Sequence, residues 1–301
     1  MTIVASAPGK IVLSGEYAVL FGAPAVCVAI TRRAVASVGE TPDRRCHLTT
    51  PGFTGSNPFA VVDAVCRDSR PAFNIDLDTT RFADSGNKIG IGSSAALTVA
   101  LLAALKDSTD VFEEALQAHA ALQGGSGSGI DIAAAVHGGL IEYERASRNV
   151  RALDWPEGLA MRVVWTGTPA STEEKLEKLA GQTAGPSRSV LGRVATQMAD
   201  AWQSCDADRI LEEYVPYIGV LRQFSIDHDL GIFDAGHDEL TDAAMADDLV
   251  YKPAGAGGGD IGVLFGRIEA GLDAFVARHA NLVHGVVPCE LDPAGVRLED
   301  A

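Results

Sequence analysis

Basic residues are outnumbered in this sequence of 301 residues. It holds 24 Lys and Arg against 40 Asp and Glu, which gives a formal net charge of −16. A nucleic-acid partner needs clustered Lys and Arg to meet the phosphate backbone, so this balance argues against one. A small anionic ligand stays possible, because a pocket can be locally positive inside an acidic protein.

Cysteine is sparse and follows no pattern. The five cysteines are scattered without a CxxC pair, and an odd count fits no closed disulfide set. We therefore expect free thiols in a reducing cytosol and no structural zinc site. No apolar run could span a bilayer, and Lys10 and Glu16 interrupt the N-terminal apolar stretch. The expectation is a soluble cytoplasmic protein, monomer or homodimer, with no membrane partner.

Several common catalytic signatures are also missing. The sequence has no GxxxxGK[ST] phosphate loop, no GxSxG nucleophile elbow and no HExxH metal motif. Residues 90–95 do satisfy a loose GxGxxA dinucleotide pattern. However, the preceding residues 81–87 are polar where that motif needs a buried strand, so a dinucleotide fold is disfavoured.

One stretch of the chain, Lys88 to Leu97, combines a glycine-bearing loop with the start of an apolar helix. Gly90 and Gly92 allow close backbone approach, and Ser93 and Ser94 add hydroxyls where the helix begins. The unpaired N–H groups of such a first turn, with the helix dipole, favour an anion, most often phosphate. A plain glycine turn with a serine N-cap explains the stretch equally well when it is taken alone.

Three further segments carry polar groups in unusual settings. Residues 2–17 predict a strand, a turn at Pro8-Gly9 and a second strand. Lys10 in this segment either faces water or points into a pocket. Asp131 follows a Gly/Ser loop at a helix N-terminus, where a capping role is the commoner one. Four glycines fall between 255 and 259, which suits a backbone that must wrap closely round something.

The chain changes in character along its length, from strand-rich to helical. The hydrophobic patterns predict strands over 23–30, 32–38, 44–50, 73–77, 140–143, 159–165, 263–265 and 285–291. They predict helices over 58–67, 95–105, 111–122, 132–136, 171–179, 187–204, 207–228 (broken at Pro216), 237–245 and 269–279. The shift towards helix after about residue 170 marks a second lobe.

These segments together fit phosphoryl transfer. A phosphate loop can hold a nucleotide while Mg²⁺ neutralises developing charge. A carboxylate such as that of Asp131 can accept the proton of an attacking hydroxyl, and a lysine such as Lys10 can stabilise that oxygen.

Over nearly its whole length the sequence resembles the GHMP small-molecule kinases. Three motifs stand in the family's order, Pro8-Gly-Lys-Ile-Val-Leu-Ser-Gly-Glu16, Gly90-Ile-Gly-Ser-Ser-Ala-Ala96 and Gly255-Ala-Gly-Gly-Gly-Asp-Ile-Gly262, with Ser128-Gly-Ile-Asp131 between the last two. The resemblance implies an α/β (α+β) two-lobed fold. Its N-terminal lobe, residues 1–156, would be like ribosomal protein S5 with a left-handed βαβ crossover, and its C-terminal lobe, 157–301, ferredoxin-like and helical.

The resemblance also assigns roles to residues. It implies ATP in a syn conformation, Asp131 as the catalytic carboxylate and Lys10 as its electrostatic partner. Nucleotide binding falls to Lys88, Gly90, Gly92, Ser93, Ser94 and Ala95, and Ser94 would reach Mg²⁺ through ATP. Binding of a small-molecule acceptor falls to Ser14, Glu16, Tyr17, Ser128, Gly129, Gly257, Gly258 and Asp260.

Finer details are similar to the phosphomevalonate kinases within that superfamily. They are Gly15-Glu-Tyr17, Ala118-His-Ala-Ala-Leu-Gln-Gly124 and Asp260. Where mevalonate kinases carry a magnesium-binding Glu, this chain offers His119, Ala120 and Gln123. The chain is shorter than many phosphomevalonate kinases, and Ile130 stands where many have Phe.

The resemblance therefore implies phosphorylation of 5-phosphomevalonate to mevalonate 5-diphosphate. Mevalonate kinase is the alternative. A homoserine or sugar kinase, a mevalonate-diphosphate decarboxylase or a non-catalytic GHMP-fold binding protein fits less well. Lys88, Arg188 and Arg193 are candidates to hold an acceptor phosphate, and solvated surface charge is the simpler interpretation of each.

Overall fold

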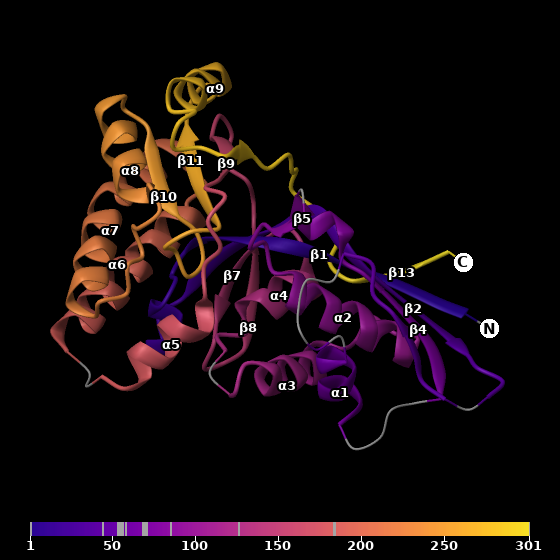
Figure 1. Cartoon of the computed structure of the whole chain (residues 1–301). Coiled ribbons are helices and arrows are strands. Elements are labelled where there is room, and N and C mark those ends of the chain that lie inside the picture. The colour runs from indigo at the N-terminus through magenta and orange to yellow at the C-terminus, as the bar shows by residue number, and fades with distance from the viewer. Residues whose placement is uncertain are drawn as a thin grey trace. The chain divides into compact units, whose positions relative to one another are not determined.

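The computed structural model describes residues 2–43, 45–52, 57, 59–67, 72–84, 86–125, 127–182 and 185–300. Two compact units alternate along the chain, whose elements are shown in Figure 1. The first comprises Met1–Ile11, Val28–Ile141 and Glu290–Ala301, and the second Val12–Cys27 and Glu142–Cys289. The lobe boundary expected after residue 156 stays a prediction, because the units take segments from both sides of it.

A seven-stranded sheet supplies most of the strands of the first unit, and its strand over residues 149–153 falls in the second. Its order is β13-β1-β2-β4-β3, and β7 pairs with both β2 and β8. The strands are β1 (Thr2–Ser14), β2 (Ala25–Glu40), β3 (His47–Thr49), β4 (Phe73–Asp78), β7 (Leu140–Glu144), β8 (Asn149–Leu153) and β13 (Arg297–Glu299). A separate two-stranded ribbon joins β5 (Ala83–Asp84) and β6 (Asn87–Lys88), with the short helix η2 (Thr80–Phe82) just before it.

Four helices of the first unit gather beside this sheet (Figure 1). They are α1 (Ala60–Cys66), α2 (Ser93–Lys106), α3 (Phe112–Leu122) and α4 (Ile130–His137). Every residue of α2 from Ala95 to Ala104 is buried, because its sequence is apolar on all sides and rich in alanine. It accordingly packs against the other three helices and against β4 and β13.

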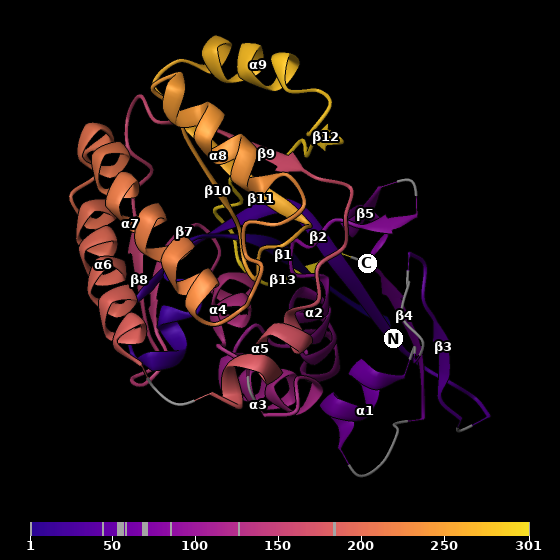
Figure 2. The ribbon, with the colours of Figure 1, turned by 60° about the vertical axis from the view of Figure 1, so that its left-hand side comes forward.

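The second unit combines a four-stranded antiparallel sheet with a short 3-10 helix and several α-helices. The sheet runs β10 (Val250–Pro253), β11 (Ile261–Gly266), β9 (Ala160–Trp165) and β12 (Gly285–Val286). The helices are η1 (Ala18–Phe21), α5 (Thr172–Ala180), α6 (Pro186–Gln203), α7 (Ala207–Asp227), α8 (His237–Ala246) and α9 (Glu269–Arg278). In Figure 2, α6, α7 and α8 lie side by side next to β10 and β11, and both α7 and α8 contact β10.

Several predicted elements differ from the structure. The expected hairpin at Pro8-Gly9 is one continuous strand, and the two strands expected over 23–38 are the single strand β2. Pro216 lies inside α7 without breaking it, because buried Tyr214, Tyr217 and Leu221 pack the helix on both sides of the proline. The last predicted strand, 285–291, is formed only over 285–286.

Other predictions fall partly outside the described residues. Arg44 and Pro58, the first residues of a predicted strand and helix, lie there, as does Ser126 of the second glycine loop. Strands β5, β6, β8, β10 and β13 were not predicted. Among the described residues, no helix has both the length and the apolar composition needed to cross a membrane.

Candidate active site

The helix α2 begins directly at the glycine loop. Gly92 is its N-cap in a left-handed conformation, φ +84°, and supplies no side-chain cap, so the serine N-cap interpretation does not hold. Ser93 and Ser94 form the first turn, which has no acidic residue. Because the first N–H groups of a helix have no partner within it, this end is suited to an anion.

The glycine loop is fastened to β1. The backbone N–H of Lys10 donates to the Ile91 carbonyl at 2.9 Å. A Cβ atom on Gly9 would lie 2.8 Å from that same carbonyl oxygen, which explains why a glycine stands inside a strand. A Cβ on Gly92 would lie 3.1 Å from both Cγ and Cε of Lys10. The aliphatic chain of Lys10 therefore runs along the loop that opens α2.

Lys10 and Asp131 form an ion pair at the end of this chain. Lys10 Nζ lies 3.3 Å from Asp131 Oδ1, and the two side chains are 10% and 26% exposed. Lys10 comes from β1, and Asp131 is the second residue of α4, whose N-cap is Gly129 with φ +84°. The first turn of α4 stabilises the carboxylate, because negative charge is favoured at a helix N-terminus.

His119 of α3 lies within the electrostatic field of this pair. Its side chain is buried, and burial lowers its pKa from 6.5, while Asp131 raises it and Lys10 and Lys88 lower it. The ring is therefore neutral near pH 7. The structure thus places one carboxylate and one ammonium group, partly open to solvent, beside a helix N-terminus that suits phosphate. Such a set can hold a phosphate group and move or orient a proton beside it.

Comparison with known proteins decides the family. Residues 58–139 match the model described as "GHMP kinases N terminal domain". The chain is 32% identical to a phosphomevalonate kinase from Streptomyces sp. (strain CL190), over 97% of each protein. It is 28% identical to a mevalonate kinase from Pyrococcus furiosus, over 86% of this chain and 87% of that one.

The chain belongs to the GHMP kinases. A solved structure of Streptococcus pneumoniae phosphomevalonate kinase in complex with phosphomevalonate and AMPPNP superposes with a TM-score of 0.78 at 18% identity, over 98% of this chain and 99% of that one. At that identity the likeness shows the fold alone, which is the mixed α/β, two-lobed GHMP kinase fold that the sequence predicts. The predicted class of enzyme, an ATP-using phosphotransferase, is confirmed by the family.

Two residues of the first GHMP kinase motif, and Tyr17 just after it, lie buried in the second unit. Glu16 Oε1 lies 2.5 Å from Lys252 Nζ, and Tyr217 OH donates to Glu16 Oε2 at 2.7 Å. Tyr17, in a left-handed conformation with φ +60°, donates its hydroxyl proton to the Ala256 carbonyl at 2.6 Å. Ser14 is fully buried. The carboxylate of Glu16 thus meets protein groups, and acceptor binding by Ser14, Glu16 and Tyr17 stays a prediction.

The glycine run after β10 closes on the protein's own backbone. A Cβ on Gly257 would lie 2.5 Å from the Ile232 carbonyl oxygen, and one on Gly258 would lie 2.6 Å from the Gly231 carbonyl oxygen and 2.3 Å from Lys175 Nζ. Asp260 N–H donates to the Thr168 carbonyl at 2.6 Å. Close packing against other loops of the second unit therefore already requires these glycines, and acceptor binding by Gly257, Gly258 and Asp260 stays a prediction.

The basic candidates for an acceptor phosphate differ in their surroundings. Arg188 donates to the carbonyls of Leu179 and Gln182 at the end of α5, and its guanidinium lies 4.8 Å from the centre of the Phe21 ring. Lys88 and Arg193 are exposed. Their role at the site stays a prediction.

The remaining predicted residues frame the two helix N-termini. Ser128 Oγ accepts from the Ile130 N–H at 3.4 Å, next to Gly129, and Gly90 has φ +89° in the glycine loop. Ala95 is buried in the first turns of α2.

Three residues of the second unit were not predicted from the sequence. They are Lys252 and Tyr217, which contact Glu16, and Lys175, which lies against Gly258. Lys252 stands three residues before Gly255, in the segment that the glycine run had already singled out.

Proposed function

We propose that this GHMP kinase of the mevalonate pathway transfers the γ-phosphoryl group of ATP to 5-phosphomevalonate, giving mevalonate 5-diphosphate and ADP. The observation that carries the phosphoryl-transfer assignment is the Lys10–Asp131 pair, 3.3 Å apart beside the N-terminus of α2. The choice of acceptor is supported by the 32% identity to a phosphomevalonate kinase over 97% of both chains. Mevalonate is the second candidate, since a mevalonate kinase is 28% identical over most of the chain.

The bonds exchanged are simple. An oxygen of the acceptor's phosphate forms a bond to the γ-phosphorus while the bond from that phosphorus to the β–γ bridging oxygen breaks, and ADP leaves with the electron pair. Lys10 offsets the negative charge where attacking and transferred groups meet. A phosphate monoester has its second pKa near 6, so about a tenth of it carries a proton at pH 7. Asp131 accepts that proton and holds the Lys10 ammonium in place.

We infer that magnesium would enter this site with the nucleotide. The described residues contain no group of three or more His, Cys, Asp or Glu side chains suited to a metal ion. Hydroxyl and phosphate oxygens are hard ligands of the kind Mg²⁺ prefers, and this ion usually keeps several waters. We therefore assign Ser94 as the contact of a Mg²⁺ ion carried by ATP, which would neutralise phosphate charge during transfer.

A coupled assay of ADP release tests the acceptor. Purified enzyme is given ATP and Mg²⁺ with mevalonate, 5-phosphomevalonate, homoserine or a simple sugar in parallel. We expect turnover with 5-phosphomevalonate and a kcat/KM for mevalonate lower by at least about 10²-fold, as expected where buried polar groups lose their partner. Phosphorylation of mevalonate with no use of 5-phosphomevalonate would reassign the chain to mevalonate kinase.

Two substitutions test the catalytic pair. Lys10→Met and Asp131→Asn each preserve side-chain size, and we expect each to lower kcat by roughly 10²–10⁴, the range of a positioned acid–base or charge-stabilising group. Lys106→Met removes a lysine from the exposed Lys106–Glu114 pair of the same unit and serves as the control. Near wild-type kcat in both site variants would remove Lys10 and Asp131 from the mechanism.

A further inference from the structure

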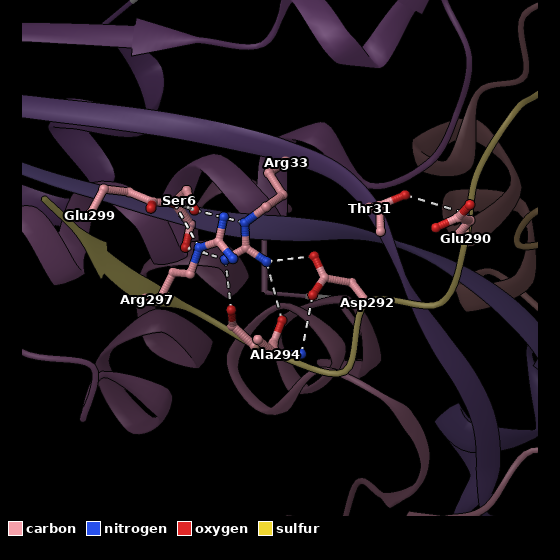
Figure 3. Close-up of polar contacts among 9 residues, drawn as sticks. Ser6, Thr31, Arg33, Glu290, Asp292, Ala294, Arg297 and Glu299 are labelled. Carbon is pink, nitrogen blue, oxygen red and sulfur yellow. Dashed lines mark hydrogen bonds and ion pairs between the residues drawn. The ribbon is translucent and has the colours of Figure 1, made fainter.

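A buried arginine joins β1 to the C-terminal segment, Glu290 to Glu299. Arg33 of β2 is only 6% exposed. Its Nε donates to Ser6 Oγ at 2.7 Å, and its Nη2 donates to the Ser6 carbonyl at 2.9 Å. On the other side, Nη1 donates to Asp292 Oδ2 at 2.6 Å, and Nη2 donates to the Gly295 carbonyl at 2.7 Å (Figure 3). The guanidinium group therefore binds β1 and the C-terminal segment at the same time.

The C-terminal segment rests directly on the last turn of α4. A Cβ on Gly138 would lie 2.3 Å from the Gly295 nitrogen, and one on Gly295 would lie 1.8 Å from the Val136 carbonyl oxygen. Val296 N–H donates to that same carbonyl at 3.2 Å, and Gly139 N–H donates to the Asp292 carbonyl at 2.7 Å. Backbone therefore meets backbone with no side chain between them, and a shift of the segment must shift the end of α4.

Lys10 and Asp131 lie on the two elements that Arg33 connects, β1 directly and α4 through the C-terminal segment. Asp131 lies five residues before Val136 in α4, a distance of about 7.5 Å along a rigid helix. Ile132 to Ala135 are buried, which leaves the helix no freedom to bend or roll. Ser6 and Lys10 are four residues apart in β1, so both side chains point to the same face of the strand.

We propose that Arg33 is a positioning residue for the Lys10–Asp131 pair, acting through Asp292 and the C-terminal segment on α4. This inference rests on the proposed function, which assigns catalysis to that pair. Arg33 holds β1 and α4 at the spacing that brings Lys10 Nζ to 3.3 Å from Asp131 Oδ1. The last residues of the chain are thereby part of the catalytic apparatus, although none of them touches the pair.

Arg33→Lys is the direct test, because it keeps the charge and removes the fork. A misplacement of about 1 Å can lower a rate by about 10²-fold, so we expect kcat to fall by about 10- to 100-fold while KM for ATP changes by less than about threefold. Asp292→Asn is a second, milder variant that keeps an acceptor oxygen. Arg162→Lys is the matched control, since the Arg162 guanidinium also forms a fork, with both carboxylate oxygens of Asp273 in the second unit. Its kcat stays at the wild-type value.

A double-mutant cycle separates positioning from general weakening. If Arg33 acts through Asp131, Arg33→Lys causes no further loss of kcat in an Asp131→Asn background, whereas independent effects multiply. Multiplying effects, or wild-type kcat in both folded Arg33→Lys and Asp292→Asn, overturn the inference. The proposed function then still stands, because its own tests are turnover with 5-phosphomevalonate and the loss of kcat in Lys10→Met and Asp131→Asn. If Arg33→Lys does not fold, the cycle is run with Asp292→Asn.

Discussion

At the scale of single residues, His237 makes an acid-sensitive contact with the glycine run. It is fully buried at the start of α8, where Nδ1 lies 2.8 Å from the Tyr251 hydroxyl and Nε2 lies 3.0 Å from the Gly259 carbonyl. A carbonyl can only accept, so Nε2 carries the proton and Nδ1 of the neutral ring accepts from Tyr251. Burial lowers the pKa of His237 from 6.5 to about 4, and the bond to Gly259 opposes this.

The sign of the resulting pH dependence follows from that lowered pKa. The unfolded chain binds the proton near pH 6.5, before the folded chain does, so the stability from the neutral ring is present above pH 6.5 and is lost as pH falls towards 4. A difference of this size corresponds to about 3 kcal/mol. We expect the gap in unfolding free energy between wild type and His237→Gln, measured with urea, to shrink by about that amount between pH 7 and pH 4. A gap that does not change with pH would contradict the assigned ionisation.

The site was predictable at residue scale where motifs carry chemistry, and not where partners are distant. Lys10 and Asp131 were singled out from the sequence, and the structure brings them together. Glu16 was predicted to contact substrate, yet its carboxylate meets Lys252 and Tyr217, the latter 201 positions away. Local sequence shows that a charge stands in an apolar setting. It does not show which distant residue neutralises that charge.

At the scale of elements, the contact between Lys10 and the loop before α2 can be tested with two glycines, Gly92 and Gly86, whose backbones are equally strained. Gly92 and Gly86 both have left-handed backbones, with φ +84° and +82°. A Cβ on Gly86 meets nothing within 4 Å, whereas one on Gly92 presses on Lys10. We expect Gly92→Ala and Gly86→Ala to lower stability similarly, by about 1–2 kcal/mol. Only Gly92→Ala should also raise KM for ATP and lower kcat, each by about tenfold, because it displaces Lys10.

Steady-state kinetics and urea unfolding of both variants measure the two effects separately. Equal losses of activity in Gly86→Ala and Gly92→Ala would mean that strain alone matters and that the contact with Lys10 does not.

The same loop shows why the prediction of helices and strands succeeded only in part. The apolar run fixed α2 to within two residues, whereas Pro8-Gly9 suggested a turn, because the sequence does not reveal that the Ile91 carbonyl needs a glycine beside it.

At the scale of the whole molecule, the chain enters the second unit twice. Residues 12–27 belong to it, and so do 142–289. The Glu16–Lys252 pair links these two passages, with side chains 3% and 0% exposed. The short strand β13 exists only because it pairs with β1 from the other end of the chain, so it was not predictable from local pattern. Burial lowers the pKa of Lys252, and the Glu16 carboxylate opposes that shift.

Breaking this pair from one side should therefore weaken the whole second unit. Lys252→Met leaves the Glu16 carboxylate buried without its cation, and we expect a loss of about 3–5 kcal/mol in unfolding free energy, measured with urea at pH 7. Lys178→Met, at the exposed Lys178–Asp229 pair of the same unit, should change it by less than about 1 kcal/mol. Adding Glu16→Gln to Lys252→Met removes the stranded charge, so the double variant should recover part of the loss. A double variant no more stable than Lys252→Met would show that packing of the lysine chain, and not its charge, joins the two passages.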